Sequence, residues 1–268
     1  MPQGRALPPG LERGPGPAQH GGMESHETGP EGAPLLVLVH GAPDRRSAFR
    51  RVAAHLQDLR VVTYDRRGYG DAAGLTPAAS LEDHARDLLV VLAGRRAVVV
   101  GHSFGGNVAL AAATLEPGLF DAVGIWESSM CWLPGWPEDH RAEVRDLART
   151  EDTRALGERM GRGLLGPDAW ERLDEGGREL RRAEGRAFAL DMGFLLEAPY
   201  DLDAVKAPFL HGLGTETTPA HHTGARLLVE RFGVPPYVIE GVGHLAHIQA
   251  PEQWAGFVRH VVALAHRP

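Results

Sequence analysis

A single serine stands in the stretch VVVGHSFGGN, residues 98–107, at the end of an apolar run. The run has the composition of a buried strand, and the glycines of GHSFG leave room for a sharp turn in which larger side chains would clash. A turn of this kind between a strand and a helix exposes the serine hydroxyl and points the N-terminus of the helix at it. The pattern therefore predicts that Ser103 is a nucleophile. A loop that is merely rich in glycine is the alternative interpretation.

A serine hydroxyl is a weak nucleophile at neutral pH and needs a histidine as its base. The sequence GVGH, residues 241–244, follows the last expected strand, and its glycines allow the loop to fold back over the edge of a sheet. We predict that His244 is the base and that His247 is its neighbour. His221 and His222 open an expected surface helix, where they would cap the helix or be solvated. No metal site is expected there, because supporting carboxylates or thiols are missing from that stretch.

Backbone N–H groups are expected to stabilise the negative charge that develops on the substrate when the serine attacks. The N–H of Phe104 follows the serine directly and begins the expected helix. A second donor is expected at the end of the first apolar run, where the sequence reads HGAP, residues 40–43, and we assign it to Ala42. His40 is expected to support this loop by hydrogen bonding rather than to act as a base.

Six short apolar runs alternate with longer helical stretches, an order typical of a doubly wound α/β fold with a mostly parallel sheet. The runs occupy residues 34–39, 60–64, 97–100, 121–126, 207–210 and 236–239. Helices are expected to begin at Asp44 as a cap, at the capping box SLED of residues 80–83, and directly after the serine turn. A last helix is expected from about Pro251 to Ala265.

The sequence divides into three parts. Residues 1–33 are rich in Pro and Gly and are expected to be disordered and to lack strands, with Met23 as a candidate for the natural start. Residues 34–127 and 201–268 are expected to form the core of the fold. Residues 128–200 contain no convincing strand and several Arg- and Glu-rich helical pieces. An insertion between strands often covers a ligand site, so we predict a helical lid; a purely structural addition is the alternative.

Composition restricts the function classes. Acidic residues outnumber basic ones, 35 against 28, and the arginines are scattered, so a nucleic-acid partner is not expected. Cys131 is the only cysteine, which excludes an intramolecular disulfide and favours a reducing compartment. The sequence shows neither a signal-peptide pattern nor an apolar run of the roughly 18 residues that a membrane span requires. We therefore expect a soluble, cytoplasmic protein without a membrane partner.

Four motifs in this order resemble those of the α/β-hydrolase superfamily: HG at residues 40–41, DRRGYG at 65–70, GHSFG at 101–105 and GH at 243–244. The resemblance covers residues from about 34 to 266. It implies the chain order nucleophile, acid, histidine, with a lid after the sixth strand of the family's sheet. Members usually begin with a β-hairpin. Because residues 1–33 show no strands that would form one, a reduced sheet of about six parallel strands is expected here. In DRRGYG, the residues Asp65, Arg66 and Arg67 are expected to pin the loop after the second strand.

The acid departs from the usual pattern of the superfamily. It commonly follows the seventh strand, in a motif like G-x-x-D-x-x-x-P, but residues 212–219 read GLGTETTP, with Thr215 at the acid position. Glu216 is one place off and would serve only if the loop shifted. The other known location follows the sixth strand, where Glu127 stands in a segment similar to that of haloalkane dehalogenases. A buried glutamate requires a partner, so we predict Glu127 as the acid. A bond to the insertion's backbone or to one of its arginines is the structural alternative.

Bulky residues gather where the insertion begins. Trp126, Trp132 and Trp136 are expected either to line an apolar substrate pocket or to pack inside the insertion. Cys131 is expected to be a packing residue, since nothing in the sequence marks it as reactive.

These residues together predict a cofactor-independent serine hydrolase that cleaves an ester or related acyl bond of a small, apolar substrate. Ser103 would attack, His244 would carry the proton, Glu127 would orient the histidine, and the N–H groups of Ala42 and Phe104 would hold the oxyanion. Neither a metal nor a cofactor is expected. A hydroxyl nucleophile excludes dehalogenase and epoxide-opening chemistry, which need a carboxylate. Carbon–carbon bond hydrolysis, perhydrolase or haloperoxidase-type activity, and an inactive binding protein are the alternatives.

Overall fold

The computed structural model describes residues 18–20 and 23–266. Its centre is an eight-stranded sheet in the order β1-β2-β4-β3-β5-β6-β7-β8. Strands β3 to β8 run parallel to one another, whereas β1 and β2 pair antiparallel. The mostly parallel α/β fold is thus confirmed. The strands are β1 (Ala18–His20), β2 (Met23–Thr28), β3 (Leu35–Val39), β4 (Arg60–Tyr64), β5 (Ala97–His102), β6 (Phe120–Trp126), β7 (Phe209–Gly214) and β8 (Tyr237–Ile239).

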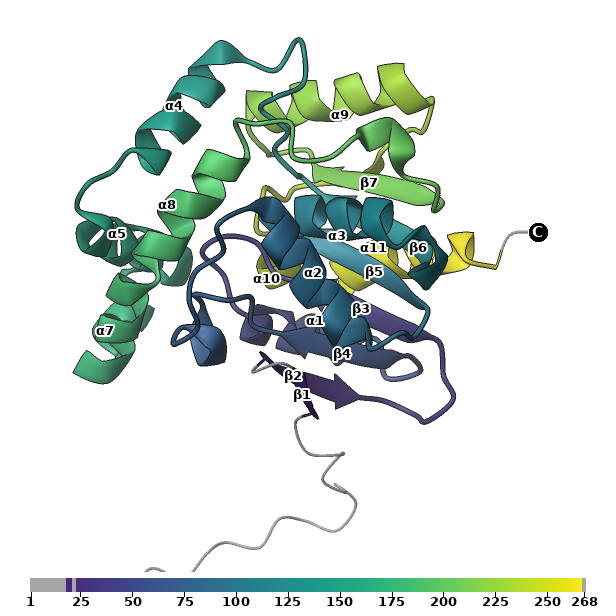
Figure 1. Ribbon diagram of the computed structural model, residues 1–268, viewed down its shortest axis with the longest axis horizontal. Coiled ribbons are helices and arrows are strands. Elements are labelled where there is room, and N and C mark those ends of the chain that lie inside the picture. Colours follow the sequence, from purple (N-terminus) through teal and green to yellow (C-terminus); the bar gives the residue numbers. More distant parts are fainter. Residues whose placement is uncertain (1–17, 21–22, 267–268) are drawn as a thin grey trace, which may run out of the picture.

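Helices cover both faces of this sheet (Figure 1). On one face lie α2 (Leu81–Leu92), α3 (Phe104–Leu115) and α9 (Pro219–Phe232). On the other lie α1 (Arg50–Ala53), α10 (Ala246–Gln249) and α11 (Pro251–Leu264). Successive strand residues point to opposite faces, so Val37 joins the first apolar cluster while Leu36 and Leu38 join the second. Burial on both faces explains why these strands are continuously apolar.

The expectation that residues 1–33 hold no strand is wrong. Strand β2 pairs antiparallel with β4, from Ser25 opposite Tyr64 to Thr28 opposite Val61, and β1 pairs with β2. Alternate residues Met23 and Ser25 are buried. The segment is polar and nearly free of β-branched residues, so only its pairing with β4 makes it a strand. Residues 1–17, 21 and 22, also expected to be disordered, lie outside the described residues.

The local helix signals had mixed outcomes. At the SLED box, Ser80 Oγ accepts a hydrogen bond from the N–H of Asp83 at 3.2 Å, as predicted, and α2 follows. The single helix expected from Asp44 is wrong, because the chain forms a 3-10 turn at Arg46–Phe49 before α1. The carboxylate of Asp44 instead accepts from the N–H of Arg45 at 2.8 Å and from His247 at 2.9 Å.

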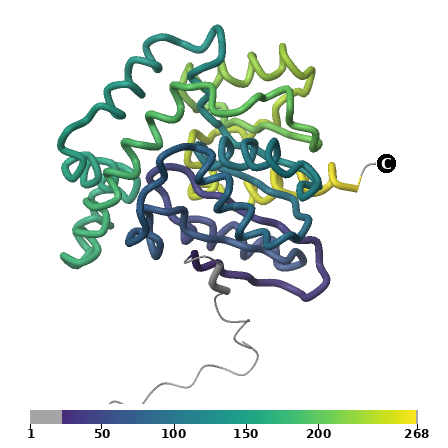
Figure 2. Tube along the Cα trace, in the orientation of Figure 1, coloured from purple at the N-terminus to yellow at the C-terminus, as the bar shows by residue number. Residues whose placement is uncertain are grey.

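Residues 128–200 form a separate helical block between β6 and β7, visible beside the sheet in Figure 2. Its helices are α4 (Glu138–Ala148), α5 (Thr153–Leu165), α6 (Pro167–Glu171), α7 (Glu175–Ala183) and α8 (Gly185–Phe194). The block contacts the loops that follow β3 and β4. Arg181 donates to the carbonyl of Pro43 at 3.2 Å, and Glu184 accepts from the N–H of Gly70 at 2.8 Å. The insertion is therefore anchored over the carboxyl ends of the parallel strands.

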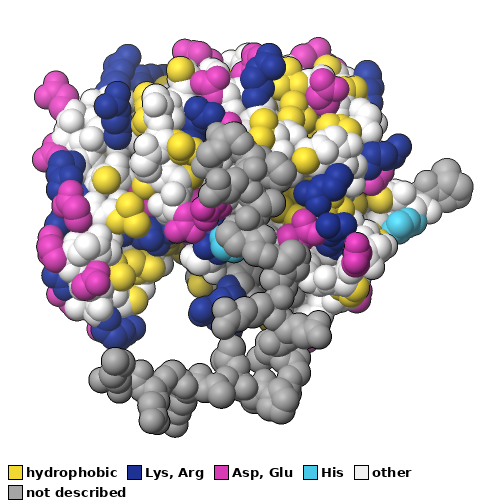
Figure 3. Space-filling view, turned by 60° about the horizontal axis from the view of Figure 1, so that its bottom comes forward, with side chains coloured by type: hydrophobic (Ala, Val, Ile, Leu, Met, Phe, Trp, Pro, Cys, Tyr) yellow, Lys and Arg dark blue, Asp and Glu magenta, His cyan; other side chains and the backbone are white. Residues whose placement is uncertain are grey.

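The surface carries charges of both signs. Acidic and basic side chains are interspersed on the face shown in Figure 3. Across residues 18–20 and 23–266, no helix combines the length and the apolar character needed to cross a bilayer.

Candidate active site

Ser103 lies in a strained turn between β5 and α3. Its backbone has φ +53° and ψ −124°, in the left-handed region that non-glycine residues rarely adopt. The flanking glycines are required by space. A Cβ at Gly101 would lie 2.2 Å from the carbonyl oxygen of Gly105, and one at Gly105 would lie 2.2 Å from that of Val39. Ser103 is partly exposed while its neighbours His102 and Phe104 are buried, so the turn presents its hydroxyl outward.

The loop after β3 packs directly against this serine. A Cβ at Gly41 would lie 2.9 Å from the Cβ of Ser103. Within the described residues, neither the backbone N–H of Ala42 nor that of Phe104 donates a hydrogen bond. Two free donors beside the serine are what a developing oxyanion requires.

His40 supports the loop as expected. Its Nδ1 donates to the carbonyl of Gly41 at 2.7 Å, and its Nε2 accepts from the N–H of Arg66 at 2.8 Å. Burial, followed by the charge of Arg66, lowers the pKa of His40 to about 4. The ring is therefore neutral at physiological pH and has no free nitrogen with which to act as a base.

Glu127 and His244 meet at the carboxyl ends of β6 and β8. The Oε2 atom of Glu127 accepts from His244 Nδ1 at 2.8 Å and from Thr217 Oγ1 at 2.6 Å, and Oε1 accepts from the N–H of Gly214 at 2.8 Å. Burial raises the pKa of Glu127, but the hydrogen bond and charge of His244 outweigh it, so the net pKa is lowered. The carboxylate is thus ionised and saturated by partners from the core rather than from the insertion.

The residues after β7 explain how the chain manages without an acid there. The side chain of Glu216 is exposed and has no polar partner in the described part of the chain. Thr215, at the usual acid position, accepts a hydrogen bond from the N–H of Gly241 at 2.9 Å. It thereby ties the loop after β7 to the loop that carries His244, while Thr217 binds Glu127.

His221 is a site residue that sequence reasoning missed, and its expected solvation is wrong. Its ring is stacked on that of His244, with centroids 4.7 Å apart and planes 7° apart, and its Nδ1 lies 3.5 Å from Glu127 Oε2. A carboxylate therefore does lie close to it, contrary to expectation. Burial, followed by the charge of His244, lowers the pKa of His221 to about 3. The only signal in the sequence for its role was its position in the first turn of the helix that follows a parallel strand. The neighbouring His222 is exposed, as predicted.

Two further buried histidines, His102 and His247, lie near the base. His102 Nε2 donates to the carbonyl of His244 at 2.8 Å. His247 is a buried neighbour as predicted, with its ring 4.0 Å from that of His102 and its Nε2 2.9 Å from Asp44. Within the described residues, no hydrogen bond joins Ser103 Oγ to His244. Such contacts are often long in the absence of substrate.

A cavity of about 320 Å³ opens beside His244. One wall comes from the core, with Ala42, Pro43, Asp44, His102, His244 and Leu245, and the other from α5, with Arg159, Met160, Gly163 and Leu164. None of the three tryptophans lines it. Trp126 packs against Phe257 with ring centroids 5.4 Å apart, and Trp132 packs against Tyr200 at 5.4 Å. The apolar lining comes instead from Met160 and Leu164 of α5 and from Ala42, Pro43 and Leu245 of the core.

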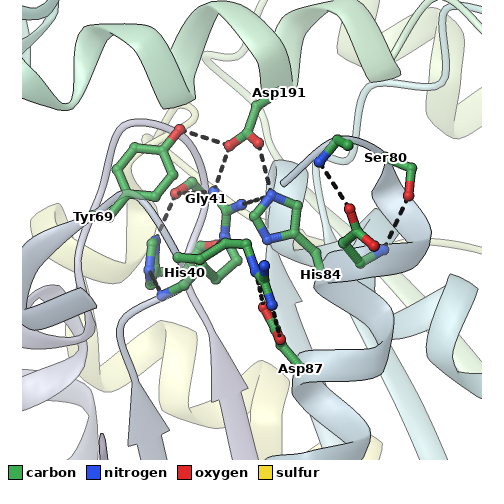
Figure 4. Close-up of polar contacts among 11 residues, drawn as sticks. His40, Gly41, Tyr69, Ser80, His84, Asp87 and Asp191 are labelled. Atoms are coloured by element: carbon green, nitrogen blue, oxygen red, sulfur yellow. Dashed lines mark hydrogen bonds and ion pairs between the residues drawn. The ribbon is translucent and has the colours of Figure 1, made fainter. Parts of the chain in front are cut away.

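The DRRGYG loop, residues 65–70, also binds the loop after β3 and the insertion. Arg66 is buried and donates to the carbonyls of His40 at 3.1 Å and Gly41 at 3.2 Å. It therefore holds in place the loop that carries the free N–H of Ala42. It also donates to Asp191 of α8 at 2.9 Å, and Asp191 accepts from Tyr69 as well (Figure 4). The insertion is therefore bonded through one arginine to the loop beside Ser103.

The neighbours of Arg66 bind locally. Asp65 accepts from the N–H groups of Arg46 at 2.7 Å and Asp71 at 2.9 Å. Arg67 forms a two-pronged pair with Asp87 of α2, at 2.5 and 2.6 Å. Asp65, Arg66 and Arg67 all make contacts that fix the loop after the second parallel strand, as predicted.

Comparisons with known proteins identify hydrolases that are similar to this chain in sequence and in fold. A mouse (Mus musculus) sn-1-specific diacylglycerol lipase is 25% identical over 255 residues, covering 86% of this chain and 81% of the relative. The 3-oxoadipate enol-lactonase 1 of Acinetobacter baylyi is 25% identical over 250 residues, covering 87% and 91%. The crystal structure of the enol-lactonase from Burkholderia xenovorans LB400 shares the fold, with a TM-score of 0.67 at 20% identity over 92% of this chain and 99% of that one. The model of the alpha/beta hydrolase family matches residues 36–257. Because that match spans most of the chain, the protein belongs to the alpha/beta hydrolase family.

Proposed function

We propose that the protein is a serine hydrolase that cleaves an ester or related acyl bond. The observation that carries the proposal is the 2.8 Å hydrogen bond between Glu127 and His244, formed next to a strained serine turn with two free backbone N–H groups. A buried, ionised carboxylate on the Nδ1 side of a histidine leaves Nε2 available as a base. The similarity to a lipase and to lactonases supports hydrolysis of an acyl–oxygen bond.

The proposed reaction has two steps. Ser103 Oγ attacks the carbonyl carbon while His244 Nε2 takes the hydroxyl proton, and the N–H groups of Ala42 and Phe104 hold the oxyanion. The same proton is passed to the departing alkoxide, which leaves an acyl-serine. Water then attacks the acyl-serine with His244 again as base, releasing the acid and restoring the serine. Glu127 keeps the imidazole oriented and balances its positive charge.

The cavity beside His244 suits a small substrate with an apolar part. Its volume of about 320 Å³ and the side chains of Met160 and Leu164 support this assignment. A lid role for the insertion, residues 128–200, is supported by the residues of α5 that form one wall of the cavity. The lone Cys131 supports a reducing, cytoplasmic location.

The test is a pair of matched serine variants. Ser103→Ala should abolish both hydrolysis of p-nitrophenyl esters and labelling by a fluorophosphonate probe, whereas Ser47→Ala, at an exposed position, should retain both. Circular dichroism checks that the variants are folded. Turnover or labelling that persists in Ser103→Ala would refute the assignment. A diketone substrate in the same panel distinguishes carbon–carbon bond hydrolysis, which uses the same residues.

A further inference from the structure

Arg159 is a cation on the wall of the cavity that has no partner among the described residues. It lies on α5 and lines the same space as His244. Other arginines of this helix are engaged: Arg154 pairs with Glu179 at 2.6 Å, and Arg162 pairs with Glu158 and Glu171, both at 3.0 Å. Arg159 makes no ion pair or hydrogen bond with any residue in the described ranges.

The acid next to Arg159 in the sequence does not compensate its charge. Glu158 is shared between Arg162 and Arg182, the latter at 2.8 Å, on the side of α5 that faces α7. Its carboxylate is thus committed to two other guanidinium groups.

The remaining lining of the cavity adds no free negative charge. Asp44 is the only carboxylate among the lining residues, and its oxygens accept from the N–H of Arg45 at 2.8 Å and from His247 at 2.9 Å. Burial, followed by the charges of His247 and His244, lowers the pKa of His102 well below its usual value, so this lining residue is neutral. Arg159 is therefore the one charged lining residue whose side chain has no hydrogen-bond or ion-pair partner among the described residues, whereas Asp44 is held by two hydrogen bonds.

Arg159 is exposed to solvent, and Met160 and Leu164 line the same wall of the cavity. A guanidinium presents a planar fork of N–H donors that matches the two oxygens of a carboxylate, and it remains charged at any working pH.

We propose that Arg159 binds a free carboxylate on the substrate, so that the enzyme prefers carboxylate-bearing esters or lactones over neutral ones. This inference rests on the proposed function and specifies its substrate class. In the bound substrate the scissile carbonyl lies at Ser103, which directly follows the lining residue His102, and the carboxylate lies at the α5 wall of the cavity. The charge belongs either to the acyl part or to the alcohol part of the ester, and the two cases are separated by choice of substrate.

The experiment compares kcat/KM on two pairs of esters with the full-length protein. Mono(4-nitrophenyl) adipate against 4-nitrophenyl hexanoate tests an acyl carboxylate, and 4-acetoxybenzoate against 4-acetoxybenzamide tests a carboxylate on the leaving group. Uncatalysed rates are subtracted. One solvated charge-assisted bond is expected to favour the carboxylate member of one pair by about tenfold, and this preference should shrink in high salt.

The variants separate a specific contact from a general effect. Arg159→Gln should lose about tenfold in kcat/KM on the preferred carboxylate ester and change less than about twofold on its neutral partner. Arg159→Lys should recover part of the loss, because it keeps the charge but not the fork. Arg149→Gln is the matched control, since Arg149 is also exposed and unpaired in the described structure but does not line the cavity.

Each outcome is decisive. Equal kcat/KM for both members of both pairs, or equal losses for Arg159→Gln on charged and neutral esters, would overturn the inference while leaving the proposed hydrolase function intact. Failure of the wild-type protein to cleave any of the four esters would refute the proposed function and this inference with it.

Discussion

Replacing Asp191 by Asn should destabilise the protein strongly. Asp191 projects from α8 into a closed space where it accepts from Arg66 at 2.9 Å, His84 at 3.0 Å and Tyr69 at 2.6 Å (Figure 4). The side chains of Asp191 and Arg66 are each 1% exposed. An asparagine of the same shape would leave the guanidinium of Arg66 buried without a counter-ion, which is one of the costliest single changes in a folded protein.

The magnitude follows from the pKa and from the burial of the pair. Burial raises the pKa of Asp191, but the charges of Arg66 and His84 prevail and bring it from 3.8 to about 2. A pKa difference of this size corresponds to about 2 kcal/mol of stability at neutral pH. Uncovering the buried cation adds to this, so we expect a loss of about 3–5 kcal/mol in the free energy of unfolding.

The stabilisation that Asp191 provides depends on pH in a direction set by its pKa shift. The pKa of Asp191 is lower in the folded than in the unfolded protein, so its stabilisation is present above about pH 4 and is lost as the pH falls towards 2. The difference in unfolding free energy between wild type and Asp191→Asn should therefore be constant near neutrality and shrink below about pH 4.

The assay is urea unfolding followed by tryptophan fluorescence, at neutral and at acidic pH. Asp203→Asn is the matched control, because Asp203 pairs with Arg231 at the surface, its side chain is 63% exposed, and its loss should cost less than about 1 kcal/mol. Hydrolysis should also fall in Asp191→Asn, since Arg66 would no longer hold the carbonyls of His40 and Gly41 in place. A loss no larger than that of the control would refute the reasoning.

Three further predictions concern the site and its surroundings. Glu127→Gln should lower kcat by roughly 10³-fold or more and Glu216→Gln by less than about twofold in an esterase assay, and the reverse order would move the acid to Glu216. Gly101→Ala should cost about 1–3 kcal/mol in thermal unfolding and remove activity, because the added Cβ meets the carbonyl of Gly105 at 2.2 Å; a fully active, equally stable variant would contradict this. Burial raises the pKa of Cys131 to about 12, so mass spectrometry should find it unmodified by iodoacetamide at pH 8 until urea is added, and rapid labelling of the native protein would disprove its burial.

Much of the core was predictable from the sequence because its signals are local. A strand buried on both faces must be continuously apolar, so the six parallel strands were visible as apolar runs. The turn around Ser103 needs glycines at fixed neighbouring positions, since any side chain at Gly101 or Gly105 would meet backbone atoms. The placement of the acid at Glu127 was predicted from a resemblance instead, because the segment after β6 is similar to that of haloalkane dehalogenases.

The sequence failed where a residue acts through partners far away along the chain. Strand β2 is polar and exists through its pairing with β4. His221 is marked only by its position in the first turn of a helix, and only the fold stacks it on His244. The contact of Arg66 with Asp191 spans two elements whose relative placement no pattern encodes.

By itself, then, the sequence located the six parallel strands and the serine turn, because glycine spacing and apolar runs are local steric requirements. It named His244 as the base candidate and, through a family resemblance, Glu127 as the acid candidate ahead of Glu216. Only the tertiary structure decided which charges remain unpaired. It closed Glu127 onto His244, engaged Arg66 with Asp191, and left Arg159 at the cavity wall with no partner in the part of the chain that the structure describes. The physical reason is that the pairing of a charge depends on distances in space, which are set by how the insertion packs against the core.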